Sequence, residues 1–142
     1  MDRFVSFTTA ISMIAKDIVK IKQNAMEQFG LKGSSVNCFF YMNQNKNGLT
    51  LTELARLCGE DKAATSRVVN ELISKGYVDQ SDSITGSKYR ANLTLTSSGK
   101  EIAKYVDEKI ADVFKTCGLE ENSREEFYKV ISLVADRIHG YK

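Results

Sequence analysis

The stretch that decides the fold is DKAATSRVVNELISKGYV, residues 61–78. Turned at 100° per residue, it forms a helix with one apolar side and one side of small and polar residues around a single arginine. The apolar side consists of Ala64, Val68, Val69, Leu72 and Ile73, and the outer side consists of Ala63, Ser66, Arg67, Asn70 and Ser74. Asp61 can cap the start of this helix, and Gly76 is a signal for its end. Since exposed helix faces are more often built from lysine and glutamate, the outer side calls for an explanation.

A shorter helix precedes this one. Thr50 and Glu53 have the spacing of a capping box, and Gly59 ends the helix that begins there. Two short helices separated by a turn are a helix-turn-helix arrangement. After Gly76 the apolar period changes to two, which predicts a strand from Tyr77 and a second strand over residues 89–95. The fold class predicted is therefore mainly α with a small β-hairpin wing, a winged helix-turn-helix.

Long amphipathic helices flank this unit on both sides. The N-terminal seam has the 3-4 spacing of a helix that packs lengthwise, with Phe4, Phe7, Ile11, Ile14, Ile18, Ile21 and Ala25. Residues 36–45 form a second helix, which Ser34 and Ser35 can cap. Apolar stripes over residues 102–114 and 127–138 predict two more helices, separated by Gly118. These long apolar faces favour a homodimer, although a monomer could also pack them against itself.

Composition places limits on the kind of protein. The 142 residues suit one domain, and 42% hydrophobic and 27% charged residues are ordinary for a globular chain. No apolar run has the length of a membrane span and no signal peptide is recognisable, so we expect a cytoplasmic protein without a membrane partner. Three widely separated cysteines argue against a disulfide framework. Basic residues without acids occupy residues 84–100, and acids gather over residues 105–128, which fits an anion-binding centre on an acidic scaffold.

The outer side of the helix over residues 62–75 fits the major groove of DNA. Small residues allow close approach, asparagine and arginine carry base-reading groups, and a helix N-terminus attracts phosphate. A surface helix that only meets water is the alternative. The capped helix before it and the basic hairpin after it favour DNA.

Two quoted segments carry a family resemblance. LTLTELARLCGEDKAATSRVVNELISKGYV, residues 49–78, followed by KYRANLTLTSSG, residues 88–99, resembles the multiple antibiotic resistance regulator (MarR) family of bacterial transcription factors. The Leu54–Ala55 pair, the Asp-Lys and Ser-Arg pairs within residues 61–67, the Lys75–Gly76 pair and the Leu-Thr-x-x-Gly of residues 95–99 are all in register. The order of elements over the whole chain is similar too.

The resemblance implies a homodimeric regulator of transcription, more often a repressor, that binds a pseudo-palindromic site in double-stranded DNA. Residues 1–30 and 100–142 would be dimerisation helices, and residues 34–99 the winged helix-turn-helix lobe. The DNA-binding residues implied are Lys62, Thr65, Ser66, Arg67, Asn70, Lys75, Lys88 and Arg90. The helical wheel differs at Thr65, which it places toward the core, from where the first turn could still reach a phosphate.

The wing departs from the family pattern. Many members have Asp-Arg-Arg there, where this chain has Ser87, Lys88 and Tyr89, followed by Arg90. Either Arg90 enters the minor groove after a shift in register, or Lys88 takes that place more weakly. Contact with phosphate is expected in both cases.

Other candidate sites have simpler explanations. Cys58 could sense oxidants, and a reactive thiol at Cys38 could touch a ligand pocket. Structural cysteines buried as small hydrophobes are commoner, and no basic residue adjoins either one. The aromatic run over residues 38–42 could help bind the small aromatic effectors of many members, but such a run is more often core. We assign no effector residue.

An enzyme is not expected. The single histidine, His139, lies near the C-terminus, and no metal-ligand spacing, phosphate loop or nucleophile motif is present, so no cofactor is predicted. The alternative function is a winged helix that binds protein without sequence-specific binding of DNA. Lys62, Arg67 and Asn70 argue against it, although fold alone does not decide function.

Overall fold

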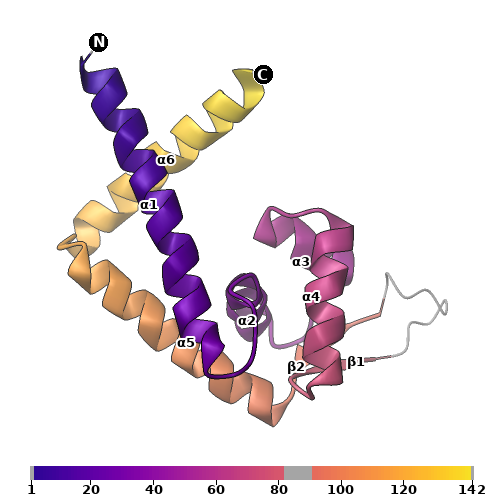
Figure 1. The fold of residues 1–142 in the computed structure, drawn as a ribbon. Coiled ribbons are helices and arrows are strands. Elements are labelled where there is room, and N and C mark those ends of the chain that lie inside the picture. The colour runs from indigo at the N-terminus through magenta and orange to yellow at the C-terminus, as the bar shows by residue number, and fades with distance from the viewer. Residues whose placement is uncertain (1, 82–90, 142) are drawn as a thin grey trace. The chain divides into compact units, whose positions relative to one another are not determined.

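The computed structural model describes residues 2–81 and 91–141, and Figure 1 shows the order of their elements. They are α1 (Asp2–Glu27), α2 (Ser35–Gln44), α3 (Leu51–Cys58), α4 (Lys62–Ser74), β1 (Val78–Gln80), β2 (Leu93–Leu95), α5 (Ser97–Thr116) and α6 (Glu121–Tyr141). The predicted fold class is confirmed. The chain divides into two compact units, Met1–Asp107 and Glu108–Lys142, with the division inside α5.

The first unit has a core to which α1, α2, α3, α4, β2 and α5 all contribute. Its largest fully buried side chains are Phe39, Met26, Met42, Leu54, Leu72, Leu93 and Val106. Phe39 meets Tyr77 edge to face at 6.2 Å between ring centroids, a favourable aromatic arrangement. Phe39 and Met42 of the aromatic run are therefore core residues, as the simpler explanation predicted.

The ends of α3 and α4 follow the predicted capping chemistry. The Glu53 amide donates to the Thr50 hydroxyl at 3.2 Å, and the Glu53 carboxylate accepts from the Thr50 amide at 3.4 Å, which completes the capping box. Gly59 ends α3 with a φ of 68°, a left-handed conformation that glycine adopts without a steric penalty. The start of α2 differs from prediction. Ser34 makes no side-chain capping bond, and the Ser35 hydroxyl donates instead to the Lys32 carbonyl at 2.6 Å.

The two strands form the predicted antiparallel hairpin. Val78 is opposite Leu95 and Gln80 is opposite Leu93, and Leu93 also forms a bridge with Leu49 before α3. This bridge joins the base of the hairpin to the helix-turn-helix. Residues 82–90, which include the predicted turn, lie outside the described residues.

The Leu-Thr-x-x-Gly motif is the joint between the hairpin and α5. The Thr96 hydroxyl donates to the Gly76 carbonyl at 2.7 Å and accepts from the Gly99 amide at 3.1 Å. A Cβ on Gly99 would collide with the Tyr77 carbonyl, so only glycine fits there. The motif thus fastens the end of the winged helix to the first turn of α5.

The second unit contains the end of α5 and all of α6. Phe114 and Tyr128 meet edge to face at 5.6 Å, yet no side chain of α6 is buried. Among the described helices, none is long and apolar enough to cross a membrane.

Candidate functional site

The outer face of α4 is as the sequence predicted. Arg67 and Asn70 are exposed and Ser66 is half-buried, while Val69 and Leu72 on the opposite side are buried in the core of the first unit. Burial of that side fixes the rotation of α4, so the outer residues are held toward solvent. The helix therefore presents an amide, a guanidinium and a hydroxyl along one side.

Asp61 organises the start of this helix. Its carboxylate accepts from the Ala64 amide at 2.7 Å, which satisfies one of the amides that a helix N-terminus leaves without a partner. Lys62, the first helical residue, is exposed beside it. The cap holds the first turn of α4 in place, and the Lys62 ammonium can reach an anion beside that turn.

Thr65 faces the core, as the helical wheel placed it. Its side chain is 3% exposed, and its hydroxyl donates to the Asp61 carbonyl at 3.0 Å. The resemblance implied a DNA contact for Thr65. In this geometry its hydroxyl is used within the first turn, where it helps to hold the cap residue.

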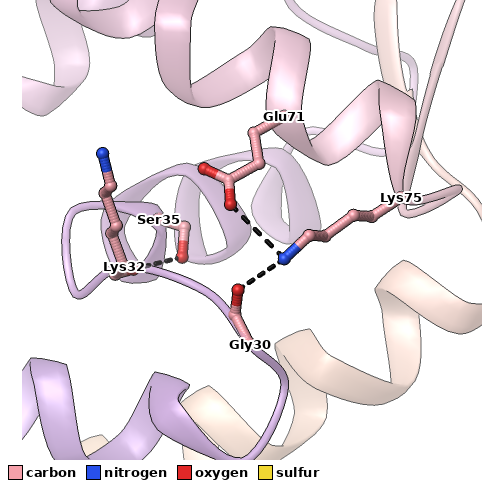
Figure 2. Close-up of polar contacts among 5 residues, drawn as sticks. All are labelled: Gly30, Lys32, Ser35, Glu71 and Lys75. Carbon is pink, nitrogen blue, oxygen red and sulfur yellow. Dashed lines mark hydrogen bonds and ion pairs between the residues drawn. The ribbon is translucent and has the colours of Figure 1, made fainter.

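Lys75 connects α4 to the loop between α1 and α2, as Figure 2 shows. Its ammonium donates to the Gly30 carbonyl and pairs with the Glu71 carboxylate at 3.4 Å. The same loop is tight against α1, because a Cβ on Gly33 would lie 2.9 Å from the Gln23 amide nitrogen. The sequence predicted that Lys75 holds a phosphate, but in the structure its ammonium links the end of α4 to this loop.

A cavity of about 1020 Å³ lies among α1, the same loop, α2, the end of α3 and α4. Three cations line it, Lys22, Lys32 and Arg67, together with three carboxylates, Glu27, Glu60 and Glu71. Its lining includes no aromatic side chain among the described residues. The aromatic side chains of residues 39–41 therefore do not line this cavity. Arg67 lies at the boundary between this cavity and the outer face.

The cavity was not foreseen from the sequence, because its residues come from segments that are distant in the chain. Cys38 and Cys58 both line it, which the sequence did not predict. A hint was available, since both were placed on helices that pack beside each other in a helix-turn-helix lobe. Among residues 2–81 and 91–141, no group of three metal-binding side chains could hold a metal ion.

The two wing candidates, Lys88 and Arg90, lie outside the described residues. Their assignment to phosphate or to the minor groove remains a prediction. The described part of the candidate site consists of α4 and its N-terminal cap.

Comparisons with known proteins agree on this architecture. Residues 29–87 match the MarR family. Staphylococcus aureus MepR in a DNA-binding conformation is 17% identical, with a TM-score of 0.80 over 93% of this chain and 98% of that one. The MepR–DNA complex is 17% identical, with a TM-score of 0.77 over 92% and 97%. A MarR protein from Peptoclostridium difficile is 19% identical, with a TM-score of 0.77 over 95% and 88%. No curated protein matches the sequence.

The structural likeness at these identities concerns the fold, and the family match concerns the sequence of the helix-turn-helix lobe. Both point to the same architecture, and the match includes all of α2, α3 and α4. The chain has the winged-helix fold of these structures, and its residues 29–87 are similar in sequence to the MarR family.

Proposed function

We propose that this protein is a transcriptional regulator that binds double-stranded DNA as a homodimer, with α4 in the major groove. The observation that carries the proposal is the outer face of α4, where Ser66, Arg67 and Asn70 stand on the second helix of a helix-turn-helix with its opposite side fixed in the core. Arginine pairs with guanine and asparagine with adenine through two hydrogen bonds each. The MepR–DNA complex, a structure of similar fold, supports the same use of the fold.

The proposed DNA contacts divide by chemistry. Ser66, Arg67 and Asn70 would meet base edges or position the helix on them, and Lys62 would meet a phosphate beside the N-terminus of α4. Lys88 and Arg90 would extend the contact from the wing. Lys75 contributes to DNA binding only by holding α4, since its ammonium is engaged by Gly30 and Glu71.

We propose the homodimer because α1 and α6 each have an apolar surface that is exposed to solvent in the single chain. The seam residues of α1 from Phe4 to Ile21 are all exposed, with Ile14 at 52%. On α6, Val130 is 60% exposed and no residue is buried. Exposed apolar stripes of this length are typical of helices that pair with a second subunit. A two-fold axis would place two α4 helices on half-sites about one DNA turn, roughly 34–36 Å, apart.

We also propose that the regulator is a repressor and that a small effector controls its binding to DNA. Blocking a promoter needs only binding, so repression is the simplest regulatory outcome of such a dimer. The cavity is our candidate for an effector site, since α1 and α4 both border it. Its cationic and anionic lining suits a polar molecule better than the purely aromatic effector expected from the resemblance.

The test is selection from random duplex DNA by the purified protein, followed by sequencing of the retained duplexes. An inverted repeat with half-sites one helical turn apart is the expected result. Weak, salt-sensitive retention without a motif would contradict sequence recognition and leave a nonspecific binder. Absence of binding at low salt would contradict the proposal and favour a winged helix that binds protein.

A further inference from the structure

Asn92, which the sequence analysis did not single out, holds the base of the wing. It precedes β2, and its side-chain amide donates to the Asn47 carbonyl in the α2–α3 loop, residues 45–50, at 2.7 Å. Its backbone amide donates to the Ser81 hydroxyl at 3.2 Å, and its carbonyl accepts from the Ser81 amide at 2.9 Å. Asn92 therefore joins three segments, which are the α2–α3 loop, the residue after β1 and the start of β2.

Gly48 in the same loop makes room for the Asn92 side chain. Its φ is 98°, a conformation that glycine adopts without a steric penalty. A Cβ at Gly48 would overlap the Nδ2, Cγ and Oδ1 atoms of Asn92. The Asn92 amide thus lies where another residue type at position 48 would place its side chain, so Asn47 and Gly48 together receive it.

The hairpin needs an anchor because it is small. Its strands β1 and β2 have three residues each, and an isolated two-stranded hairpin is only marginally stable. One anchor is the bridge between Leu49 and Leu93, whose two backbone hydrogen bonds are 3.1 and 2.8 Å long. That bridge does not depend on side chains. Within residues 2–81 and 91–141, Asn92 supplies the side-chain hydrogen bond between the hairpin and the α2–α3 loop, and no other side chain does.

The loop that receives Asn92 leads directly into the helix-turn-helix. Leu49 precedes Thr50, which caps α3, and α3 is followed by α4. The base of the wing is consequently tied to the segment from which α3 starts. A wing and a helix that bind one duplex together gain from a fixed relation, because an element that is ordered only on binding lowers the affinity.

We propose that Asn92 is a positioning residue for DNA binding, which holds the wing in place relative to α4 and acts through the wing instead of touching DNA. This role rests on the proposed function, in which Lys88 and Arg90 of the wing bind the duplex together with α4. Asn92 carries no charge, and its side-chain donor is engaged by Asn47. Its loss should therefore weaken the contribution of the wing without removing any cation.

The test is a double-mutant cycle on the selected duplex, measured by fluorescence anisotropy at one salt concentration. The wing variant combines Lys88→Ala with Arg90→Ala, and its loss of affinity defines the wing contribution. Asn92→Ala should weaken binding by about 2- to 10-fold, the range that corresponds to one hydrogen bond. In the wing variant the same substitution should cause no further loss, because the cations that it positions are gone. Unchanged affinity in Asn92→Ala, natural affinity in the wing variant, or equal losses with and without the wing cations would each overturn the proposal.

Asn43→Ala is the matched control for a general loss of stability. The Asn43 amide donates to the Asp107 carboxylate on α5 at 3.2 Å, so this variant also removes a hydrogen bond between distant segments of the first unit. It should lower the urea midpoint much as Asn92→Ala does, and it should leave the wing contribution unchanged. An equal reduction of the wing contribution by Asn43→Ala would show that stability, and not positioning, explains the effect.

Gly48→Ala disturbs the same contact from the other side. Its Cβ would displace the Asn92 amide, so the wing contribution should fall although Asn92 is still present. Gly118→Ala is the control, because Gly118 has a φ of 67° with open space around it, and its substitution adds backbone strain alone. Equal wing contributions in the two glycine variants would overturn the role of the contact between Asn92 and Gly48.

Hydrogen exchange without DNA separates the anchor from the proposed function. Asn92→Ala should speed the exchange of the Leu49, Ser81 and Leu93 amides, which donate across the base of the wing, and Asn43→Ala should not. Unchanged exchange in Asn92→Ala would overturn the anchor itself. If the natural chain selects no DNA, the proposed function fails and the role of Asn92 in binding fails with it, whereas faster exchange would still establish the anchor.

Discussion

Asp61 shows how much one side chain contributes to the position of α4. Its carboxylate satisfies the Ala64 amide, and its carbonyl accepts from the buried Thr65 hydroxyl. Asp61→Ala removes the side-chain cap and should lower the free energy of unfolding by about 1 kcal/mol. Urea unfolding of both proteins at one protein concentration measures this. Asp61→Asn is the control, since its oxygen still caps the helix and only the smaller charge–dipole contribution is lost. An equal loss in Asp61→Ala and Asp61→Asn would contradict the capping role.

Substitution of Arg67 tests whether α4 recognises DNA bases. Its side chain is exposed on the outer face of a helix whose other side is fixed in the core. If its guanidinium makes the two hydrogen bonds that guanine offers, Arg67→Ala should weaken binding to the selected DNA by about 1–3 kcal/mol. Fluorescence anisotropy against selected and scrambled duplexes measures the loss. Arg67→Lys is the matched control, because it keeps the charge but not the paired donors, and it should lose specificity while holding its affinity for scrambled DNA. An unchanged affinity in Arg67→Ala would remove Arg67 from the interface.

At the scale of elements, the lysine that begins α4 and the lysine that follows its last residue have opposite surroundings. Lys62 is exposed at the N-terminus, and Lys75 is bound to the α1–α2 loop and to Glu71. Lys62→Met should flatten the dependence of log affinity on log salt by about one counterion. Lys75→Met should leave that slope unchanged and lower the free energy of unfolding by less than about 1 kcal/mol, since the pair is partly exposed. A flattened slope in Lys75→Met would show that Lys75 leaves Gly30 to bind phosphate.

The helices were predictable from sequence to within a few residues, because caps and apolar periods are local. Thr50 with Glu53, Gly59 and Asp61 each act within one turn, so their roles could be read without knowing the fold. The prediction that Ser34 caps α2 was wrong, because the same local spacing allows a cap without requiring it. Ser34 makes no side-chain hydrogen bond to the first turn of α2, and the hydroxyl of the next residue, Ser35, donates to the Lys32 carbonyl.

The site was predictable in part. The exposed face of α4 follows from the position of its buried residues, so Arg67 and Asn70 could be placed on it from the helical wheel. The hydrogen bond between Lys75 and Gly30 could not be predicted, because it joins residues 45 positions apart. Such contacts depend on how helices pack, which no local spacing encodes.

At the scale of the whole molecule, the apolar surface of α1 and α6 is the feature that a single chain does not account for. The winged helix-turn-helix has a filled core that extends into α5, and it needs none of the α1 seam before Ala25 to bury its own apolar residues. The cost of leaving that seam in water grows with its area, at roughly 25 cal/mol per Å². A second copy of the same helices is the partner that we propose for this surface.

The dimer prediction follows from this surface. Ile14 lies in the middle of the α1 seam, and Ile14→Glu should shift the protein toward the mass of one chain, 15.9 kDa, in sedimentation velocity, whereas we expect twice that mass for the natural chain. Thr9→Glu is the matched control, since at 100° per residue it lies opposite the seam, and it should remain a dimer. The selected inverted repeat should be bound far more weakly by Ile14→Glu, because two half-sites are held by one binding event only while the subunits are joined. A natural chain with the mass of one copy at every concentration would contradict the dimer, and a selected motif without inverted symmetry would contradict its two-fold arrangement on DNA.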